Sequence, residues 1–152
     1  MHEKLAGFPQ PAIRECPACE AVAARPSLQV QQFEYGAAAD RAILSAEVQV
    51  WTCDECGFEF TGGDAEELRH AAVCKHLGLL SPGEIIALRK RLGLSQADFA
   101  ELTKFGEASI KRWEAGAVLQ NVAADNLLRV IDDANGCKIV KRIAQERAAI
   151  AK

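Results

Sequence analysis

Long apolar runs are missing from this sequence. No stretch reaches the roughly 18 consecutive apolar residues that a membrane span needs, so we expect no membrane-spanning segment. Residues 1–5 lack a basic start followed by an apolar stretch, so we also expect no secretory signal and a cytoplasmic protein. With 49% hydrophobic and 26% charged residues, the composition is that of a folded protein rather than of a disordered tail.

Catalytic constellations are also missing. No nucleophile–base pair and no pair of carboxylates occurs at a suggestive spacing. An enzymatic interpretation therefore has no positive feature to support it. We expect a binding or regulatory protein rather than an enzyme.

Charge is divided unevenly along the 152 residues, a length that suits one large domain or two small ones. Residues 1–80 carry 12 acidic and 6 basic side chains, whereas residues 81–152 carry 9 acidic and 12 basic ones. The division suggests two modules with different partners. The basic half suits nucleic acid, and the acidic half would attract a basic protein.

Four of the six cysteines form two C-x2-C pairs, Cys16 with Cys19 and Cys53 with Cys56, with 33 residues between the pairs. Disulfides are uncommon in cytoplasmic proteins, so metal ligation is the better interpretation. Each pair lets a tight turn direct two sulfurs at one ion, and two pairs supply the four thiolates of a tetrahedral zinc site. Four thiolates leave no open coordination position, so we predict one structural Zn²⁺ per chain.

The segment between the pairs is predicted to form strands. Residues 28–33 and 46–51 alternate apolar and polar side chains, as half-buried strands do, and a loop around residues 37–41 separates them. A strand next to each cysteine pair is how a zinc ribbon brings distant pairs together. A sheet this small has little core, so the metal would supply much of the folding energy.

A second ligand set is also compatible with the spacing. His70 and Cys74 follow the second pair and complete the pattern C-x2-C-x13-H-x3-C, which is close to that of a small zinc finger. That set would leave Cys16 and Cys19 unexplained. The segment also fits a helix that begins at Asp64 with a carboxylate three residues later. The inward side of this helix would hold Leu68, Ala71, Ala72 and Cys74.

From residue 81 onward the sequence predicts short helices. Ser81, Pro82 and Glu84 provide a cap, a first-turn proline and a capping carboxylate. A second helix begins at Ser95 and is followed by a turn at residues 103–106 and a third helix at 107–114. Two short helices joined by a tight turn form a helix-turn-helix. The expected inward residues are Ile85, Ile86, Leu88, Leu92, Phe99, Ala100, Leu102, Ile110 and Trp113.

Two more helices are predicted after this motif. Asn121 caps the first, which runs to Ala134, and Asn135-Gly136 breaks the chain. The last helix runs from Lys138 to about residue 150. The inward side of the first holds Val122, Leu127, Leu128, Val130 and Ile131, and one side of the last holds Ile139, Val140, Ile143, Ala144 and Ile150. The terminal helix would pack on its own domain or on a second copy, and the lone Cys137 is expected to be buried.

Residues from about 85 to 131 resemble the phage-repressor-like, Xre-type family of helix-turn-helix domains. The matching residues are Leu94-Ser95-Gln96, Phe99-Ala100, Ile110 and Arg112-Trp113-Glu114-Ala115-Gly116. Lys104 stands where many members have glycine, so a residue with a side chain must adopt a left-handed conformation there. The resemblance implies that the second helix of the motif lies in the major groove.

The DNA-contacting residues implied by this resemblance are Gln96, Glu107, Ala108, Ser109, Lys111 and Arg112. Lys111 and Arg112 would donate to guanine edges or to phosphates, and Gln96 would brace the reading helix or contact a phosphate. The alternative for Arg112 is an ion pair with Glu114 or another carboxylate that only supports the fold. Domains of this family bind paired half-sites as dimers, which implies a homodimer through the C-terminal half and a palindromic operator.

The two halves together resemble the MqsA/YgiT family of zinc-finger antitoxins over about residues 14–133. The residues that carry the resemblance are the four paired cysteines, Leu80-Ser81-Pro82, Leu94-Ser95-Gln96, Phe105-Gly106, Lys111-Arg112-Trp113-Glu114 and Leu127-Leu128-Arg129. It implies an N-terminal domain with structural zinc that binds a toxin, and a C-terminal domain that dimerises and represses the operon's own promoter. The chain departs from the family in its helix after about residue 136. It also has Ala108 where some members read bases with asparagine.

We therefore predict an α+β protein: a zinc-ribbon-like β domain at residues 1–63, a connecting helix at 64–80, and an all-α helix-turn-helix domain at 81–152 that binds DNA and dimerises. The predicted function is that of a DNA-binding repressor and antitoxin in a type II toxin–antitoxin system. The alternative is a stand-alone Xre-type regulator whose zinc domain serves dimerisation or protein interaction.

Overall fold

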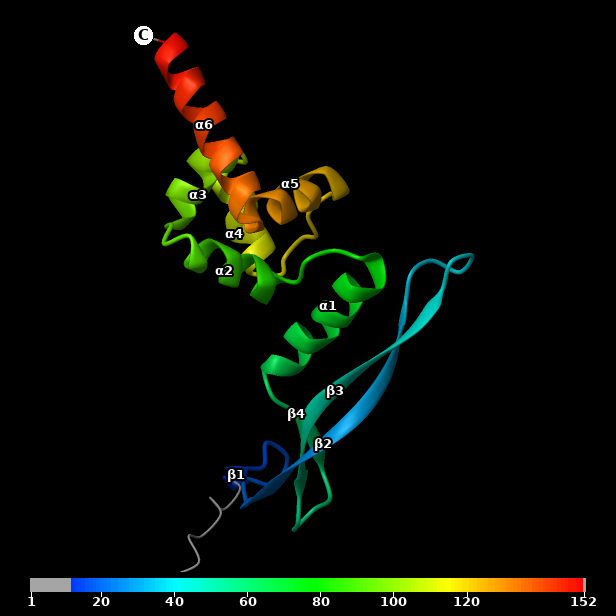
Figure 1. Cartoon of the computed structure of the whole chain (residues 1–152). Helices are drawn as coiled ribbons and strands as arrows, with labels where there is room; N and C mark the ends of the chain where they lie inside the picture. The colour runs from blue at the N-terminus through cyan, green and yellow to red at the C-terminus, as the bar shows by residue number, and fades with distance from the viewer. Residues whose placement is uncertain (1–11, 152) are drawn as a thin grey trace, which may run out of the picture. The chain divides into compact units, whose positions relative to one another are not determined.

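The computed structural model describes residues 12–151. Within them, four strands are followed by six helices (Figure 1), so the expected α+β class is confirmed. The chain divides after Arg69 into two compact units, which we describe separately. Residues 1–5, on which the expected lack of a secretory signal rests, lie outside the described residues.

The N-terminal unit contains one antiparallel sheet with strand order β1-β2-β3-β4. The strands are β1 (Arg14–Glu15), β2 (Val22–Tyr35), β3 (Ala42–Cys53) and β4 (Glu59–Thr61). β2 and β3 pair along their length, from Ala24 opposite Cys53 to Tyr35 opposite Ala42. β1 and β4 pair with them only near the cysteines, so the rest of β2 and β3 forms a two-stranded ribbon that ends in a hairpin (Figure 1).

Both predicted strands exist, but they are longer than expected and the ribbon is not half-buried throughout. On one face Ala46, Val48 and Val50 of β3 are buried. On the other face Leu28 and Val30 of β2 are exposed. The alternation identified the strands correctly, but alternation in one strand does not say which face a second layer covers.

The base of the ribbon has a small aromatic cluster. Trp51 is buried, and its ring lies 6.4 Å from that of Phe60 in a stacked arrangement. The guanidinium of Arg14 lies 4.3 Å from the centroid of the Trp51 ring, which is a favourable cation–π distance. These contacts join β1, β3 and β4 close to the cysteine pairs.

The helices follow the predicted boundaries closely except at the C-terminus. They are α1 (Asp64–Leu77), α2 (Pro82–Arg91), α3 (Gln96–Thr103), α4 (Glu107–Glu114), α5 (Val122–Asp132) and α6 (Ala134–Ile150). Ser81 and Glu84 form the predicted capping box at the start of α2. Ser95 caps α3 and Asn121 caps α5 through their side-chain oxygens. These caps satisfy backbone N–H groups that a helix end otherwise leaves unpaired.

One hydrophobic core holds the C-terminal unit together. Its buried members are Ile85, Leu88, Phe99, Ala100, Ile110, Trp113, Ala124, Leu128, Ile131 and Cys137. The buried positions predicted for Ile110, Trp113 and Cys137 are confirmed. The inward positions predicted for Leu68, Val122 and Val130 are wrong, because all three side chains are exposed.

The predicted break at Asn135-Gly136 is also wrong. α6 begins two residues after α5 ends, because the Asp133 side chain accepts from the backbone N–H groups of Asn135 and Gly136 and caps the new helix. A Cβ on Gly136 would lie 2.0 Å from the carbonyl oxygen of Val130. The glycine therefore permits close packing of α5 and α6 rather than ending a helix. The predicted apolar side of the last helix is largely open, since Ile139, Ile143 and Ile150 are exposed.

In the described part of the chain, no single helix is long and apolar enough to cross a membrane. Only α1 and α2 taken together, as a bent pair, match a span, and they do so by length and composition alone.

Candidate metal centre and nucleic-acid interface

Two tight turns bring the four paired cysteines together. Cys16 and Cys19 lie in the turn between β1 and β2, whereas Cys53 ends β3 and Cys56 lies in the turn before β4. In the second turn the N–H of Gly57 donates to the carbonyl of Cys53 at 2.8 Å. Gly57 has a φ of 73°, a left-handed conformation that glycine adopts without strain.

The sulfur positions fit a tetrahedral ion. The Sγ atoms of Cys16 and Cys56 are 3.7 Å apart, those of Cys19 and Cys53 are 3.6 Å apart, and all four lie within 4.8 Å of one another. In a regular tetrahedron with metal–sulfur bonds of about 2.3 Å, neighbouring sulfurs are about 3.8 Å apart. The four cysteines are therefore positioned to bind one metal ion.

Electrostatics also favour a cation at this position. Burial raises the pKa of Cys16, but backbone N–H groups and the neighbouring thiols lower it more strongly, to about 7. At Cys19 a backbone hydrogen bond lowers the pKa, but Cys56, burial and the other two thiols outweigh it and raise the pKa to about 12. Hydrogen bonds among the thiols therefore favour the charged form at Cys16 and oppose it at Cys19. A cation held by the four cysteines would favour the thiolate form of all of them.

The alternative ligand set is not brought together. Among residues 12–151 the four paired cysteines are the one group of potential ligands close enough to share an ion. His70 lies beside Gly116, where a Cβ would meet the imidazole ring at 3.7 Å. Cys74 is buried, and this burial raises the pKa of its thiol. Both residues therefore belong to the packing of the C-terminal unit.

The helix-turn-helix consists of α3 and α4. Lys104 ends α3 with a φ of 60°, so the left-handed conformation predicted for this residue is confirmed. The hydroxyl of Thr103 donates to the carbonyl of Phe99 at 2.7 Å and accepts from the N–H of Phe105 at 3.3 Å. These bonds stabilise the turn in which Lys104 has a left-handed conformation, which glycine adopts more easily.

A buried charge network fixes the C-terminal end of α4. Arg89 of α2 donates to both carboxylate oxygens of Glu114, at 2.6 and 2.9 Å, and also to the carbonyl of Leu94. Gln96 donates to the same carboxylate at 2.8 Å. Burial raises the pKa of Glu114, but the hydrogen bonds from Arg89 and Gln96 outweigh it and lower that pKa. Gln96 thus contacts α4, the helix it was expected to brace.

The remaining candidate DNA-contacting residues lie on α4. Glu107, Ala108, Lys111 and Arg112 are exposed, and Ser109 is half-buried. Lys111 and Glu107 form an ion pair at 2.8 Å, and a pair this exposed contributes little to stability. Within residues 12–151 no hydrogen bond or ion pair holds the Arg112 guanidinium. The alternative pairing of Arg112 with Glu114 does not occur, because Arg89 and Gln96 occupy that carboxylate.

A second buried carboxylate joins the chain before α2 to α5. Asp125 accepts from the N–H of Leu80 at 2.8 Å, from Gln120 at 3.0 Å and from Arg129 at 2.7 Å. Arg129 also donates to the carbonyl of Gly78 at 2.9 Å. Burial raises the pKa of Asp125, but these hydrogen bonds lower it more strongly. The backbone of residues 78–80 is thereby fastened to α5.

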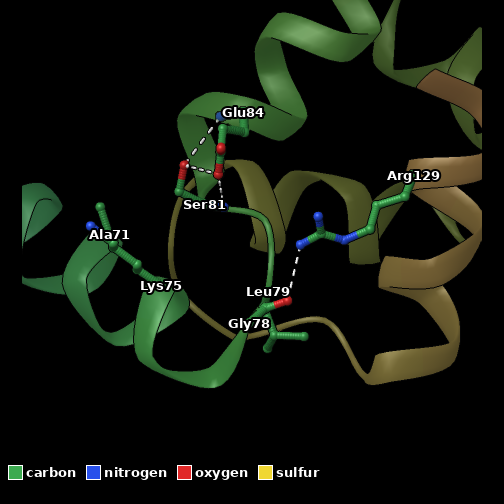
Figure 2. A pocket seen from close by; sticks show the side chains of 7 residues that line it. All are labelled: Ala71, Lys75, Gly78, Leu79, Ser81, Glu84 and Arg129. Carbon is green, nitrogen blue, oxygen red and sulfur yellow. Dashed lines mark hydrogen bonds between the residues drawn. The ribbon is translucent and has the colours of Figure 1, made fainter. Parts of the chain in front are cut away.

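An open depression of about 610 Å³ lies over this junction (Figure 2). Apart from Lys75, its polar lining groups already have partners: Ser81 bonds to Glu84, and Arg129 bonds to Gly78. The depression therefore marks a structural junction rather than a formed ligand site. The residues that line it are Ala71, Lys75, Gly78, Leu79, Ser81, Glu84 and Arg129.

The comparison with known families agrees with this geometry. The sequence model of MqsA, described as the antitoxin component of a bacterial toxin–antitoxin system, matches residues 14–136. The chain belongs to the MqsA antitoxin family. No curated protein matches the chain. Membership supports an antitoxin role and implies a toxin partner, and the family is one of antitoxins and regulators rather than of enzymes. The match begins before the first cysteine pair and ends within the first turn of α6.

Sequence reasoning missed the partners of Glu114 and Asp125. Arg89 and Glu114 are 25 positions apart, and Leu80 and Asp125 are 45 positions apart. Neither pair has a helical or strand spacing, so no local pattern could have connected its members. Both carboxylates lie close in sequence to predicted core residues, which is a weak indication that they are buried.

Proposed function

We propose that this protein is the antitoxin of a type II toxin–antitoxin system and represses transcription from its own promoter. The N-terminal unit would bind the toxin and the C-terminal unit would bind operator DNA. The observation that carries the proposal is the combination, within one MqsA-family match, of a four-cysteine cluster and a helix-turn-helix.

The ion held by Cys16, Cys19, Cys53 and Cys56 is proposed to be Zn²⁺. Four thiolates at tetrahedral separations suit zinc, which has no geometric preference of its own and binds sulfur well. No ligand position stays open for water, so the ion would serve folding rather than catalysis. It would cross-link the turn before β2 to the turn after β3 and so hold the base of the ribbon closed.

The proposed reading surface is the outer face of α4. Arg112 is its strongest candidate for base contact, because its guanidinium is exposed and is not held by an internal partner. Lys111 and Glu107 lie one turn apart on the same helix and neutralise each other until a phosphate or a base competes. Gln96 would act mainly by bracing α4 through Glu114. Ala108 would make at most an apolar contact with a thymine methyl group, and Ser109 would donate to a phosphate.

The proposed operator-binding form is a homodimer through the C-terminal half. One short reading helix covers only a half-site, and dimers of such domains bind half-sites that are about 34–36 Å apart. The exposed Ile139, Ile143 and Ile150 of α6 provide apolar surface for a second copy. Basic side chains outnumber acidic ones by 12 to 9 in residues 81–152, which favours binding to DNA over repulsion from it.

Titration of the full-length protein with DNA from upstream of its own gene tests the repressor function. Fluorescence anisotropy should show binding much tighter than to a shuffled duplex of the same composition. The affinity should fall steeply as salt rises, because each phosphate contact releases counterions. Equal affinity for the two duplexes would contradict sequence-specific repression and leave only a toxin-binding role.

A further inference from the structure

One face of the β2–β3 ribbon displays apolar side chains to solvent. Leu28, Val30 and Ile43 are 70%, 67% and 70% exposed. Directly opposed residues of an antiparallel pair lie on the same face of the sheet, so the register assigns all three to one surface. We call this surface the open face; it comprises Leu28, Val30, Gln32, Glu34, Ile43, Ser45, Glu47 and Gln49.

The opposite face of the ribbon is covered by the chain itself. Val48 and Val50 are buried there, and Gln31 on that face accepts a hydrogen bond from Arg69 of α1 at 2.7 Å. Trp51, at the base of the ribbon, lies on the same face as Leu28 and is buried. The exposed apolar side chains of this face are therefore confined to its outer part.

The composition of the open face is that of a contact surface. Isolated exposed apolar residues are common in proteins, but Leu28 and Val30 are neighbours on this face and Ile43 lies further along it, and apolar side chains gathered on one exposed face favour a binding site. Val30 and Ile43 are β-branched and have few rotamers to lose on binding. A two-stranded ribbon has little stability by itself in water, so a partner on this face would also stabilise the ribbon.

The charge of the open face restricts what can cover it. Its strand positions include two carboxylates, Glu34 and Glu47, and no cationic side chain. Arg41, in the chain that leads into β3, pairs with Glu34 at 3.1 Å, and Arg14 lies over the ring of Trp51 at the base of this face. Two copies of this face would bring like charges together, whereas a basic partner would pair with them. Charge thus favours a basic protein over a second copy of this chain.

We propose that the open face is the surface on which the toxin docks, and that the toxin presents an apolar patch surrounded by basic side chains. The toxin would cover Leu28, Val30 and Ile43 and place a cation against Glu47. This inference rests on the proposed antitoxin function and adds to it the docking surface and the chemistry of the partner.

The test compares variants of the full-length protein in binding the toxin encoded beside its gene. The double variant Leu28→Gln/Val30→Thr removes apolar surface while keeping strand-compatible side chains, and Glu47→Lys reverses one charge. Val122→Thr is the matched control, because Val122 is 65% exposed but lies on α5 in the other unit. Metal content and circular dichroism show whether each variant retains its folded N-terminal unit.

We expect the double variant to raise the dissociation constant roughly tenfold to a hundredfold, since truncation of central apolar contacts dominates most interfaces. Glu47→Lys should also weaken binding, most strongly at low salt. Val122→Thr should bind as tightly as the unaltered protein. All three should retain metal, and all should still bind operator DNA.

Two results would overturn the inference. One is unchanged toxin affinity in the double variant, which refutes the docking surface and leaves the antitoxin function intact. The other is loss of self-association in the double variant with no change in toxin affinity, which would assign the open face to a second copy. If the unaltered protein does not bind the toxin at all, the antitoxin function and this inference both fail.

Discussion

Gln96 at the start of α3 donates a hydrogen bond to Glu114 at the end of α4, with an Nε2–Oε2 distance of 2.8 Å. The same carboxylate accepts two hydrogen bonds from Arg89 of α2. Three helices therefore meet at one carboxylate, whose side chain is 5% exposed. Ile110 and Trp113 pack the inner face of α4 into the core. α4 is thus held by charge at one end and by packing along its length.

Replacement of this carboxylate should destabilise the C-terminal unit strongly. We expect Glu114→Ala to lower the free energy of unfolding by about 3–5 kcal/mol, because it leaves the largely buried charge of Arg89 without a counter-charge. Glu107→Ala is the control and should cost less than about 1 kcal/mol, since its ion pair with Lys111 is exposed. Urea titration followed by circular dichroism measures both values. Equal effects of the two substitutions would contradict the bracing role.

Acid stability should depend on Asp125. Its folded-state pKa is lowered, so the unfolded state binds protons more tightly than the folded state does. The stabilisation is complete above the ordinary aspartate pKa of about 4 and is lost as the pH falls through the lower folded value. Asp125→Asn should therefore reduce the free energy of unfolding at pH 7 and flatten its decline below about pH 4. Urea titrations between pH 7 and pH 2.5 measure this decline, and a slope as steep as that of the unaltered protein would argue against the role of Asp125.

The metal site gives a prediction that separates the two ligand sets. Cys53→Ser should abolish metal binding and unfold the N-terminal unit, because three thiolates no longer close the tetrahedron. DNA binding by the C-terminal unit should largely persist. Cys74→Ser is the matched control and should retain one metal ion per chain, as should His70→Ala. Atomic emission measures metal content, and loss of metal in His70→Ala but not in Cys16→Ser would restore the alternative set.

Arg112 should contribute to operator affinity. If its guanidinium reads a base, Arg112→Ala should weaken operator binding by roughly 1–3 kcal/mol and relax the preference at one position. Lys141→Ala removes an exposed cation on α6 and should change the affinity much less. Anisotropy titrations on operator variants measure the effect at each base. Equal weakening on every sequence would make Arg112 a phosphate contact instead.

Two glycines in helices should respond in opposite ways to alanine. Gly136→Ala places a Cβ 2.0 Å from the Val130 carbonyl oxygen, so α5 and α6 must move apart, at a cost of about 1–3 kcal/mol. Gly83 lies in α2 with no atom near the position of a Cβ, so Gly83→Ala should be neutral or stabilise by up to about 1 kcal/mol. Thermal unfolding compares the two. A stabilising Gly136→Ala would show that the close helix packing is not required.

Local patterns predicted the parts of the fold that local chemistry determines. The capping box at Ser81, the caps at Ser95 and Asn121, and the two cysteine pairs were all visible as short motifs, and each has the expected geometry. The left-handed Lys104 was predicted from a family pattern and is present. These features depend on neighbours within a few residues, which a sequence displays directly.

Features that depend on distant contacts were missed or mistaken. Asn135-Gly136 resembled a helix break because the sequence does not show that Asp133 caps the next helix, or that Val130 lies against Gly136. Val122 has the spacing of an inward residue but lies in the first turn of α5, where the core does not reach it. The partners of Glu114 and Asp125 come from other helices. Burial of this kind is fixed by tertiary packing, which no periodicity in one segment specifies.

The central claim is that this chain neutralises a toxin, and capture of the tagged full-length protein at its native expression level tests it most directly. Mass spectrometry should identify one small basic protein in near-equal amount, and expression of that protein alone should arrest growth unless this chain is supplied with it. A preparation that contains only copies of this chain would contradict the claim and favour a stand-alone transcriptional regulator.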